Sequence, residues 1–268
     1  SYSVSEDAFM TWGWRIPFIS SVLLIGISMY VQLHMEETDA FKELQKLQKK
    51  KQAEQPQAAV VRRSPVLEAI AKYPKRIALA AGAFLSIQVS FYILIGFVLA
   101  YGTDADGAGM TRDQMLFAVL LASVLQIPAQ FLAASYSDKH GRRGIFMLGA
   151  ILTGVWAFAL FPLIDTGNFW LIVLGLSGGL MFLGMMYGPQ AAFFTELFST
   201  EVRYSGASLG YQMGAILGGA FAPTIATILW KEYSIVWVSV YIAIASVLSL
   251  ISVLMLTETY KTSLDETI

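Results

Sequence analysis

The chain has 268 residues, of which 56% are hydrophobic and only 14% are charged, and its mean hydropathy is +0.60. A soluble globular domain carries about 25% charged residues, so this composition excludes an ordinary water-soluble domain and predicts a membrane protein. The net charge is −1 and cysteine is absent, which excludes disulfides and thiol sites and gives no basic field for nucleic acid. The two histidines, His34 and His140, are far apart, so we expect no metal site and no cofactor.

Seven stretches are long and apolar enough to cross a bilayer as helices. Such a helix needs about 20 largely apolar residues. The apolar runs are continuous rather than alternating, which favours helices over barrel strands. Apart from Arg15 at one extreme end, none contains a charged residue. The predicted spans are Trp14–Leu33, Ile77–Tyr101, Gln114–Tyr136, Gly144–Ile164, Asn168–Phe194, Ser205–Trp230 and Trp237–Leu256.

Lysine and arginine gather on one side of these spans. Fifteen of the eighteen lie in connections on the same face, and only Arg15, Arg112 and Lys231 lie on the other. The positive-inside rule makes the crowded face cytoplasmic, so the C-terminus is predicted inside and the N-terminus outside. The number of predicted spans is odd, the first span starts outside, and the chain begins with Ser1 rather than methionine. We therefore expect further helices of the same protein to precede this chain.

The connection after the first span has two parts. Glu36–Gln55 is charged and predicted to be helical, and a linker follows it. Ser64 and Pro65 then indicate a helix start, with serine as the cap and proline in the first turn. The apolar residues that follow share one face and suit a helix on the membrane surface: Val66, Leu67, Ile70 and Tyr73. A solvated tether and a regulatory segment are both open interpretations of this connection.

The connection between the third and fourth spans reads ASYSDKHGRRG over residues 134–144. Gly141 permits a tight turn, and Asp138 can pair with the arginines or favour the positive end of a nearby helix. Spacing alone leaves open an ordinary loop that fixes topology. The run resembles the signature loop of the major facilitator superfamily, G-x-L-[SA]-D-[RK]-x-G-R-[RK], although Ala134 and Tyr136 replace the usual glycine and leucine.

A second block, GPQAAFFTELFSTEVRYSGASLGYQ, covers residues 188–212. Together with WGWRIPF (12–18) and EET (36–38), it resembles the metabolite:proton symporter family of that superfamily, which includes carriers for proline and betaine, α-ketoglutarate, citrate and shikimate. The resemblance covers the whole chain and implies an all-α integral membrane fold, with the seven spans as helices six to twelve of twelve. The implied parts are the last helix of the N-terminal bundle (1–35), a cytoplasmic interdomain loop with a surface helix (36–76), a C-terminal six-helix bundle (77–256) and a cytoplasmic tail (257–268).

In such transporters, charges on the cytoplasmic face form a conformational latch between helices, closed in the outward-facing state and broken in the inward-facing one. By position, the resemblance assigns this role to Asp138, Arg142, Arg143, Glu196 and Arg203. Glu258 matches an acidic residue of sugar-type relatives, but Thr257 stands where they have proline.

Small residues mark one face of the sixth span. Gly206, Gly210, Gly214 and Gly218 recur at four-residue steps, and this spacing places them on one helix face, where a neighbouring helix can approach closely. Static packing and the sliding of alternating access are both open interpretations. Pro189 and Pro223 are expected to bend their helices.

A few hydrogen-bonding side chains lie within the spans, where each needs a partner or a wet cavity. Any single one can tie two helices together, but as a set they favour the wall of a substrate cavity. The candidates are Gln88, Tyr92, Gln126, Gln130, Tyr187, Gln190, Tyr211 and Gln212. No aspartate, glutamate, arginine or lysine lies deep in a span, so a proton-coupling group is expected in the preceding helices.

These features predict a secondary active transporter in a bacterial inner membrane. It is expected to move a small polar metabolite, an organic acid or zwitterionic osmolyte, with a proton as coupling ion, and not to transport without the preceding helices. A seven-span receptor or signalling protein is the alternative, since it shares the predicted topology. An intramembrane enzyme would need catalytic groups within the spans, and no acid or histidine is present there. A pore is a further possibility, which saturable, proton-linked flux would distinguish from a carrier.

Overall fold

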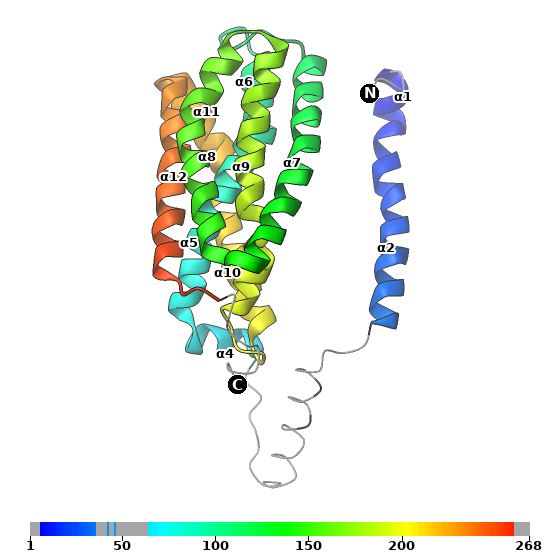
Figure 1. Ribbon diagram of the computed structural model, residues 1–268. Coiled ribbons are helices and arrows are strands. Elements are labelled where there is room, and N and C mark those ends of the chain that lie inside the picture. Colours follow the sequence, from blue (N-terminus) through cyan, green and yellow to red (C-terminus); the bar gives the residue numbers. More distant parts are fainter. Residues whose placement is uncertain (1–5, 36–41, 43–45, 47–63, 260–268) are drawn as a thin grey trace. The chain divides into compact units, whose positions relative to one another are not determined.

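The computed structural model describes residues 6–35 and 64–259, together with Lys42 and Lys46. Every regular element in these ranges is a helix, and seven helical spans are long and apolar enough to cross a membrane (Figure 1). The predicted all-α membrane fold is therefore confirmed. The observed spans differ from the predicted limits by at most four residues at either end. Apart from the two lysines, the predicted helix over Glu36–Gln55 lies outside the described residues.

The chain divides into two units, residues 1–57 and residues 58–268, which are described separately. The first contains α1 (Glu6–Thr11), the 3₁₀ turn η1 (Gly13–Arg15) and the span α2 (Ile16–His34). Pro17 lies in the first turn of α2, where its missing N–H costs nothing. None of the residues of α2 is buried, so this span offers an apolar surface suited to lipid or to another helix.

The second unit contains six spans, two of which are interrupted by a five-residue π-helical segment. The short helix α4 (Pro65–Lys72) precedes them. The spans are α5 (Pro74–Tyr92) with η2 (Ile93–Phe97) and α6 (Val98–Thr103), then α7 (Arg112–His140), α8 (Arg142–Asp165), α9 (Phe169–Glu196), α10 (Arg203–Ala215) with η3 (Ile216–Ala220) and α11 (Ala222–Glu232), and α12 (Ile235–Met255).

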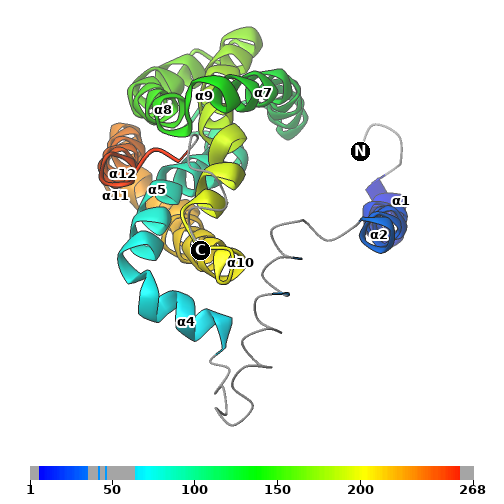
Figure 2. The same ribbon diagram turned by 60° about the horizontal axis from the view of Figure 1, so that its bottom comes forward.

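The six spans form an arc of neighbouring helices. Helix α7 packs against α9, α9 against α8, α8 against α12, α12 against α5, and α5 against α10 (Figures 1 and 2). Helix α9 also contacts α5 and α10. The span that begins with α5 is the most buried of the six and α7 is the least buried.

Helix α4 begins where the sequence predicts a helix, and its position on the membrane surface stays a prediction. Val66, Leu67 and Ile70 are exposed, as a helix on a membrane surface requires, whereas Tyr73 lies edge-on to Phe198, with ring centroids 5.8 Å apart. Ser64 precedes the helix, but its side chain makes no capping hydrogen bond. The start of α4 therefore depends on the fixed φ of proline in its first turn rather than on a serine cap.

Glycines bring the backbones of α10 and α5 close together. A methyl group added at Gly210 would lie 2.7 Å from Ala80 Cβ, and one added at Gly214 would lie 2.8 Å from the Ala81 carbonyl oxygen. The same series of glycines continues at Gly218, where an added methyl group would again meet α5. At the first glycine of the series, Gly206, an added methyl group would meet Phe198 instead. The glycines thus allow two helix backbones to approach closely.

Serine side chains join α12 to its neighbours. Ser249 Oγ accepts a hydrogen bond from the backbone N–H of Ser86 on α5 at 2.8 Å, and the hydroxyls of Ser86 and Ser246 lie 3.0 Å apart. Ser239 donates to the carbonyl of Ala157 on α8 at 2.7 Å. These serines share one face of α12 and form a seam of hydroxyl groups, the serine seam, that fixes α12 to both neighbours.

We expect Gly214→Ala to destabilise the protein by about 1–3 kcal/mol, because the added methyl group would overlap the backbone of α5. Gly144→Ala is the matched control, since a methyl group at that helical glycine meets nothing within 4 Å and alanine favours helix by up to about 1 kcal/mol. Thermal unfolding of both variants in detergent measures the difference. Equal stability of the two variants would contradict a tight α10–α5 contact.

Candidate functional site

The signature turn between α7 and α8 is a single glycine. Gly141 has φ of +107°, a backbone conformation that L side chains rarely adopt. A methyl group at this position would also lie 2.9 Å from Glu258 Oε2. Glycine therefore meets two requirements here: it lets α8 start immediately after α7 ends, and it leaves room for a carboxylate from the segment after α12.

Arg142, the first residue of α8, is the centre of a charged network at this end of the bundle. It pairs with Asp138 and donates to Ser137 Oγ at 2.9 Å, both on α7. It also donates to Glu196 on α9 through Nη2 at 3.0 Å and Nε at 3.5 Å. Two-point contact of this kind suits the planar fork of a guanidinium. Arg142 and Glu196 are 12% and 17% exposed, but Asp138 is 62% exposed, so the pair with Glu196 is internal and Asp138 lies at the rim.

The segment after α12 completes the network. Thr259 donates to Glu196 Oε2 at 2.5 Å, and the carboxylate of Glu258 accepts the backbone N–H groups of Arg142 and Arg143 at 2.9 and 3.1 Å. Those N–H groups lack partners within α8 because they lie in its first turn, where the helix dipole also favours an anion. The Arg142 network, as we call it, consists of Ser137, Asp138, Arg142, Glu196, Glu258 and Thr259.

Arg143, another predicted latch residue, extends its side chain toward α12 rather than toward an acid. Its guanidinium donates to the carbonyls of Val253 and Leu254 at 3.2 and 2.9 Å. These carbonyls are at the C-terminal end of α12, where a helix lacks donors and favours a cation. Arg143 thus ties the start of α8 to the end of α12.

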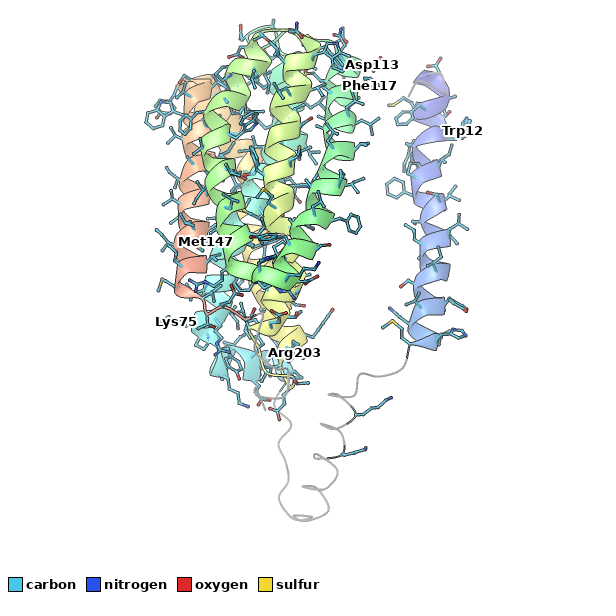
Figure 3. All side chains as sticks on the ribbon, in the orientation of Figure 1. Trp12, Lys75, Asp113, Phe117, Met147 and Arg203 are labelled. Atoms are coloured by element: carbon cyan, nitrogen blue, oxygen red, sulfur yellow. The ribbon has the colours of Figure 1, made fainter. Side chains whose placement is uncertain are left out.

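The structure does not bring Arg203 into the Arg142 network. Its Nε donates to the carbonyl of Phe198 at 3.4 Å, and Arg76 donates to the carbonyl of Leu197 at 2.6 Å. Both arginines therefore bind carbonyls just beyond the end of α9. Lys75 and Arg203 lie at the same end of the bundle, opposite Asp113 (Figure 3). Sequence spacing does not indicate this role of Arg76, which by position alone is one of the topology-setting cations.

Four of the predicted cavity residues lie in two pairs along the contact of α5 with α9 and with α10–η3. Tyr211 on α10 lies against Phe84 of α5, with ring centroids 4.3 Å apart and the rings tilted by 33°, and it lies near Tyr187 on α9. Gln88 and Tyr92 of α5 lie next to the glycines of η3. We call Gln88, Tyr92, Tyr187 and Tyr211 the polar junction.

The two glutamines of α7 lie at a different contact. A methyl group at Gly188 of α9 would lie 2.6 Å from the carbonyl oxygen of Gln130, and one at Gly184 would lie 3.3 Å from Gln126 Cγ. Both glutamines are half-buried beside this close approach of two helices. Of the remaining candidates, Gln190 is buried and Gln212 is exposed.

The other end of the bundle carries a second set of polar contacts. Lys231 of α11 pairs with Asp104 at 3.2 Å and Asp106 at 3.6 Å, and its Nζ lies 3.9 Å from the ring centroid of Trp230. Tyr101 donates to Asp165 at 2.5 Å. The backbone N–H of Asp106 and the Lys231 ammonium lower the pKa of the Asp104 carboxyl below its ordinary value. These contacts hold the α6–α7 connection to the ends of α8 and α11.

We expect Glu258→Ala to lower the free energy of unfolding by about 0.5–2 kcal/mol, because two N–H groups of the α8 N-terminus lose their carboxylate acceptor. Hydrogen exchange should rise selectively at the Arg142 and Arg143 amides. Thr257→Ala, at an exposed neighbouring position, is the control. Unchanged exchange in the first turn of α8 would contradict the assignment.

Comparison with known proteins agrees with these features. Residues 79–267 match the family model of the Major Facilitator Superfamily. The chain is 34% identical over 98% of its length to the inner membrane metabolite transport protein YhjE of Escherichia coli, covering 58% of that protein. It is 30% identical over 97% of its length to the shikimate transporter of the same bacterium, covering 58%, and 25% identical over 96% to its proline/betaine transporter, covering 50%. The chain thus spans little more than half the length of these relatives. By sequence and by its helical spans, the chain belongs to the major facilitator superfamily, whose members are membrane transporters.

Proposed function

We propose that the protein is a secondary active transporter that moves a small polar metabolite across a bacterial inner membrane by alternating access, coupled to proton symport. Family membership supports transport. The observation that carries alternating access is the glycine contact between α10–η3 and α5, where backbone meets backbone. The same membership argues against a seven-span receptor.

The α5–α10 contact suits helices that shift against each other. Gly210, Gly214 and Gly218 themselves carry no side chains that would block a displacement along α5, although Tyr211 beside them lies against Phe84 of α5. Segment η3 lies against α5, and η2 lies against α11. Because π-helical segments interrupt the regular hydrogen bonding of a helix and often occur at functional sites, we infer that both spans bend at these segments.

The polar junction is our candidate for the part of the substrate site that this bundle supplies. Its amide and phenol groups offer hydrogen-bond donors and acceptors without charge. This chemistry suits hydroxyl and carboxylate groups, and relatives are named for shikimate and for proline and betaine. We propose the same broad class of substrate here, with Gln126, Gln130, Gln190 and Gln212 as further cavity residues. The proton-coupling acid is proposed to come from outside residues 64–259.

We assign the latch to the Arg142 network and place it, with the C-terminus, on the cytoplasmic side because most basic connections share that side. Within this bundle the network joins α7, α8, α9 and the segment after α12. The half-buried Arg142–Glu196 pair keeps these ends together. The exposed carboxylate of Asp138 is the member free to exchange partners between conformations.

The proposed function is tested by uptake of radiolabelled shikimate, proline and glycine betaine into membrane vesicles from cells that express the protein together with the helices that we propose to precede this chain. We expect saturable uptake of at least one compound, stimulated by an inward proton gradient and lost with a protonophore. Vesicles without the protein are the control. Flux that rises linearly with concentration would indicate a pore, and uptake indifferent to the proton gradient would contradict symport.

Asp138→Asn is expected to slow transport about two- to five-fold without weakening substrate binding, because one partly exposed ion pair contributes up to about 1 kcal/mol. Arg142 would keep its pair with Glu196, so the bundle should stay folded. Uptake rate and substrate affinity are measured in parallel. Asp113→Asn, at the opposite end of the bundle, is the control; full uptake rates in well-inserted Asp138→Asn would exclude the latch role.

A further inference from the structure

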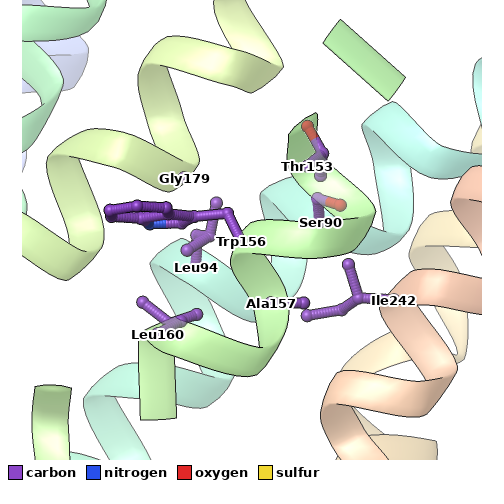
Figure 4. A pocket seen from close by; sticks show the side chains of 8 residues that line it. All are labelled: Ser90, Leu94, Thr153, Trp156, Ala157, Leu160, Gly179 and Ile242. Atoms are coloured by element: carbon purple, nitrogen blue, oxygen red, sulfur yellow. The ribbon is translucent and has the colours of Figure 1, made fainter. Parts of the chain in front are cut away.

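A small pocket lies inside the six-helix bundle where α5, α8, α9 and α12 meet (Figure 4). Its free volume is about 10 Å³, the space of roughly one water molecule, and its lining is mostly apolar, including Leu94, Trp156 and Ile242. This pocket has no room for a further ligand. The outer surface of the bundle differs, because the short helix α4 leaves one of its sides open to a partner.

Helix α4 has three sides of different chemistry, since successive residues of a helix point about 100° apart. The first side packs against α10 and α5, and Ala69 on it is fully buried. The second side is charged: Lys72 pairs with Glu68 at 2.6 Å and with Glu201 of the α9–α10 connection at 3.5 Å. The third side, which we call the apolar side of α4, consists of Val66, Leu67 and Ile70, which are 41%, 61% and 47% exposed.

The apolar side of α4 differs from what a helix in water exposes. A solvated helix turns polar residues outward, whereas a contiguous exposed apolar patch marks contact with protein or membrane. Only Tyr73 separates α4 from α5, which opens a span apolar enough to cross a membrane. Helix α4 lies across the end of the bundle (Figures 1 and 2), so its apolar side is at the level where lipid headgroups meet hydrocarbon.

Basic residues flank the apolar side of α4 along the chain. Arg62 and Arg63 come just before the helix and Lys75 comes just after it; we call these three the flanking cations. Lys75 is exposed at the same end of the bundle as Arg203 (Figure 3), and none of the described acids forms an ion pair with it. Lys72, in contrast, is already held by two carboxylates. Cations beside an apolar helix face at a bilayer surface attract anionic headgroups.

We propose that α4 binds anionic phospholipid, with its apolar side at the acyl boundary and the flanking cations at the headgroup phosphates. Of the proposed function, this inference uses only the cytoplasmic placement of this end of the bundle, because the cytoplasmic leaflet carries the anionic lipid. Bound lipid would cover the side of α4 that the described helices leave open. Because α4 also packs against α10, it would hold the start of that helix at the membrane surface.

The first test measures lipid contact at single positions. The chain has no cysteine, so Leu67→Cys and Glu68→Cys can each carry one bimane fluorophore in the protein expressed with its preceding helices, any cysteine of which is changed to serine. In liposomes whose phospholipids carry a nitroxide near the headgroup, we expect stronger quenching at Leu67→Cys, on the apolar side, than at Glu68→Cys. Equal quenching at both positions, or none at Leu67→Cys, would overturn the proposal. The readout needs no transport, so it stands apart from the uptake test.

The second test measures the preference for headgroup charge. At Leu67→Cys, nitroxide-labelled phosphatidylglycerol should compete about five-fold better than labelled phosphatidylcholine, since even one cation near an anionic surface contributes about that factor. Changing all three flanking cations to glutamine should abolish the preference. Val247→Cys, on the exposed apolar side of α12, is the matched control and should show none. A preference at Leu67→Cys no greater than at Val247→Cys, or one that survives loss of the cations, would overturn the proposal.

Discussion

Helices in hydrocarbon gain little by burying apolar faces against each other, because lipid tails are as apolar as leucine side chains. A bundle must therefore be held together by close packing and by hydrogen bonds. In this chain, hydrogen bonds and close packing occur at different helix contacts. Serines fix α12 to α5 and α8, whereas glycines bring α10 against α5 and α7 against α9. The serine contacts lie in the middle of the arc of helices, and the glycine contacts lie toward its two ends.

The ends of the helices face a different constraint, since each terminus leaves backbone groups without partners. In and beside the Arg142 network, side chains that are distant in sequence provide these partners. Glu258 takes the first N–H groups of α8, and Arg143 binds the last carbonyls of α12. Arg76 performs the same task beyond α9. Residues that look like elements of a charge switch thus also terminate helices, so changes in the network are expected to affect stability as well as transport.

The spans could be predicted from the sequence because apolar length is a local property that no later folding step changes. The glycine face of the sixth span could be predicted because the four-residue spacing of its glycines is close to the helical repeat. Other features depend on the tertiary partner. Nothing in Ile93–Phe97 or Ile216–Ala220 distinguishes a π-helical segment from an ordinary turn of helix. Ser239, Ser246 and Ser249 are single polar residues in an apolar run, and only the neighbouring helices show that they share a seam. Likewise, sequence spacing cannot show that Glu258 lies in the Arg142 network whereas Arg203 does not. The position of each side chain depends on the path of the backbone beyond the end of α12 or α9.

The turn at Gly141 links two positions that are far apart along the chain. Its positive φ already restricts the residue, but the carboxylate of Glu258 occupies the space that a side chain would need. A lineage that replaced the acid with a small residue would lose one of the two reasons for retaining glycine. The two sites should therefore covary across homologous sequences, with departures from glycine at the turn appearing mainly where the acid is absent.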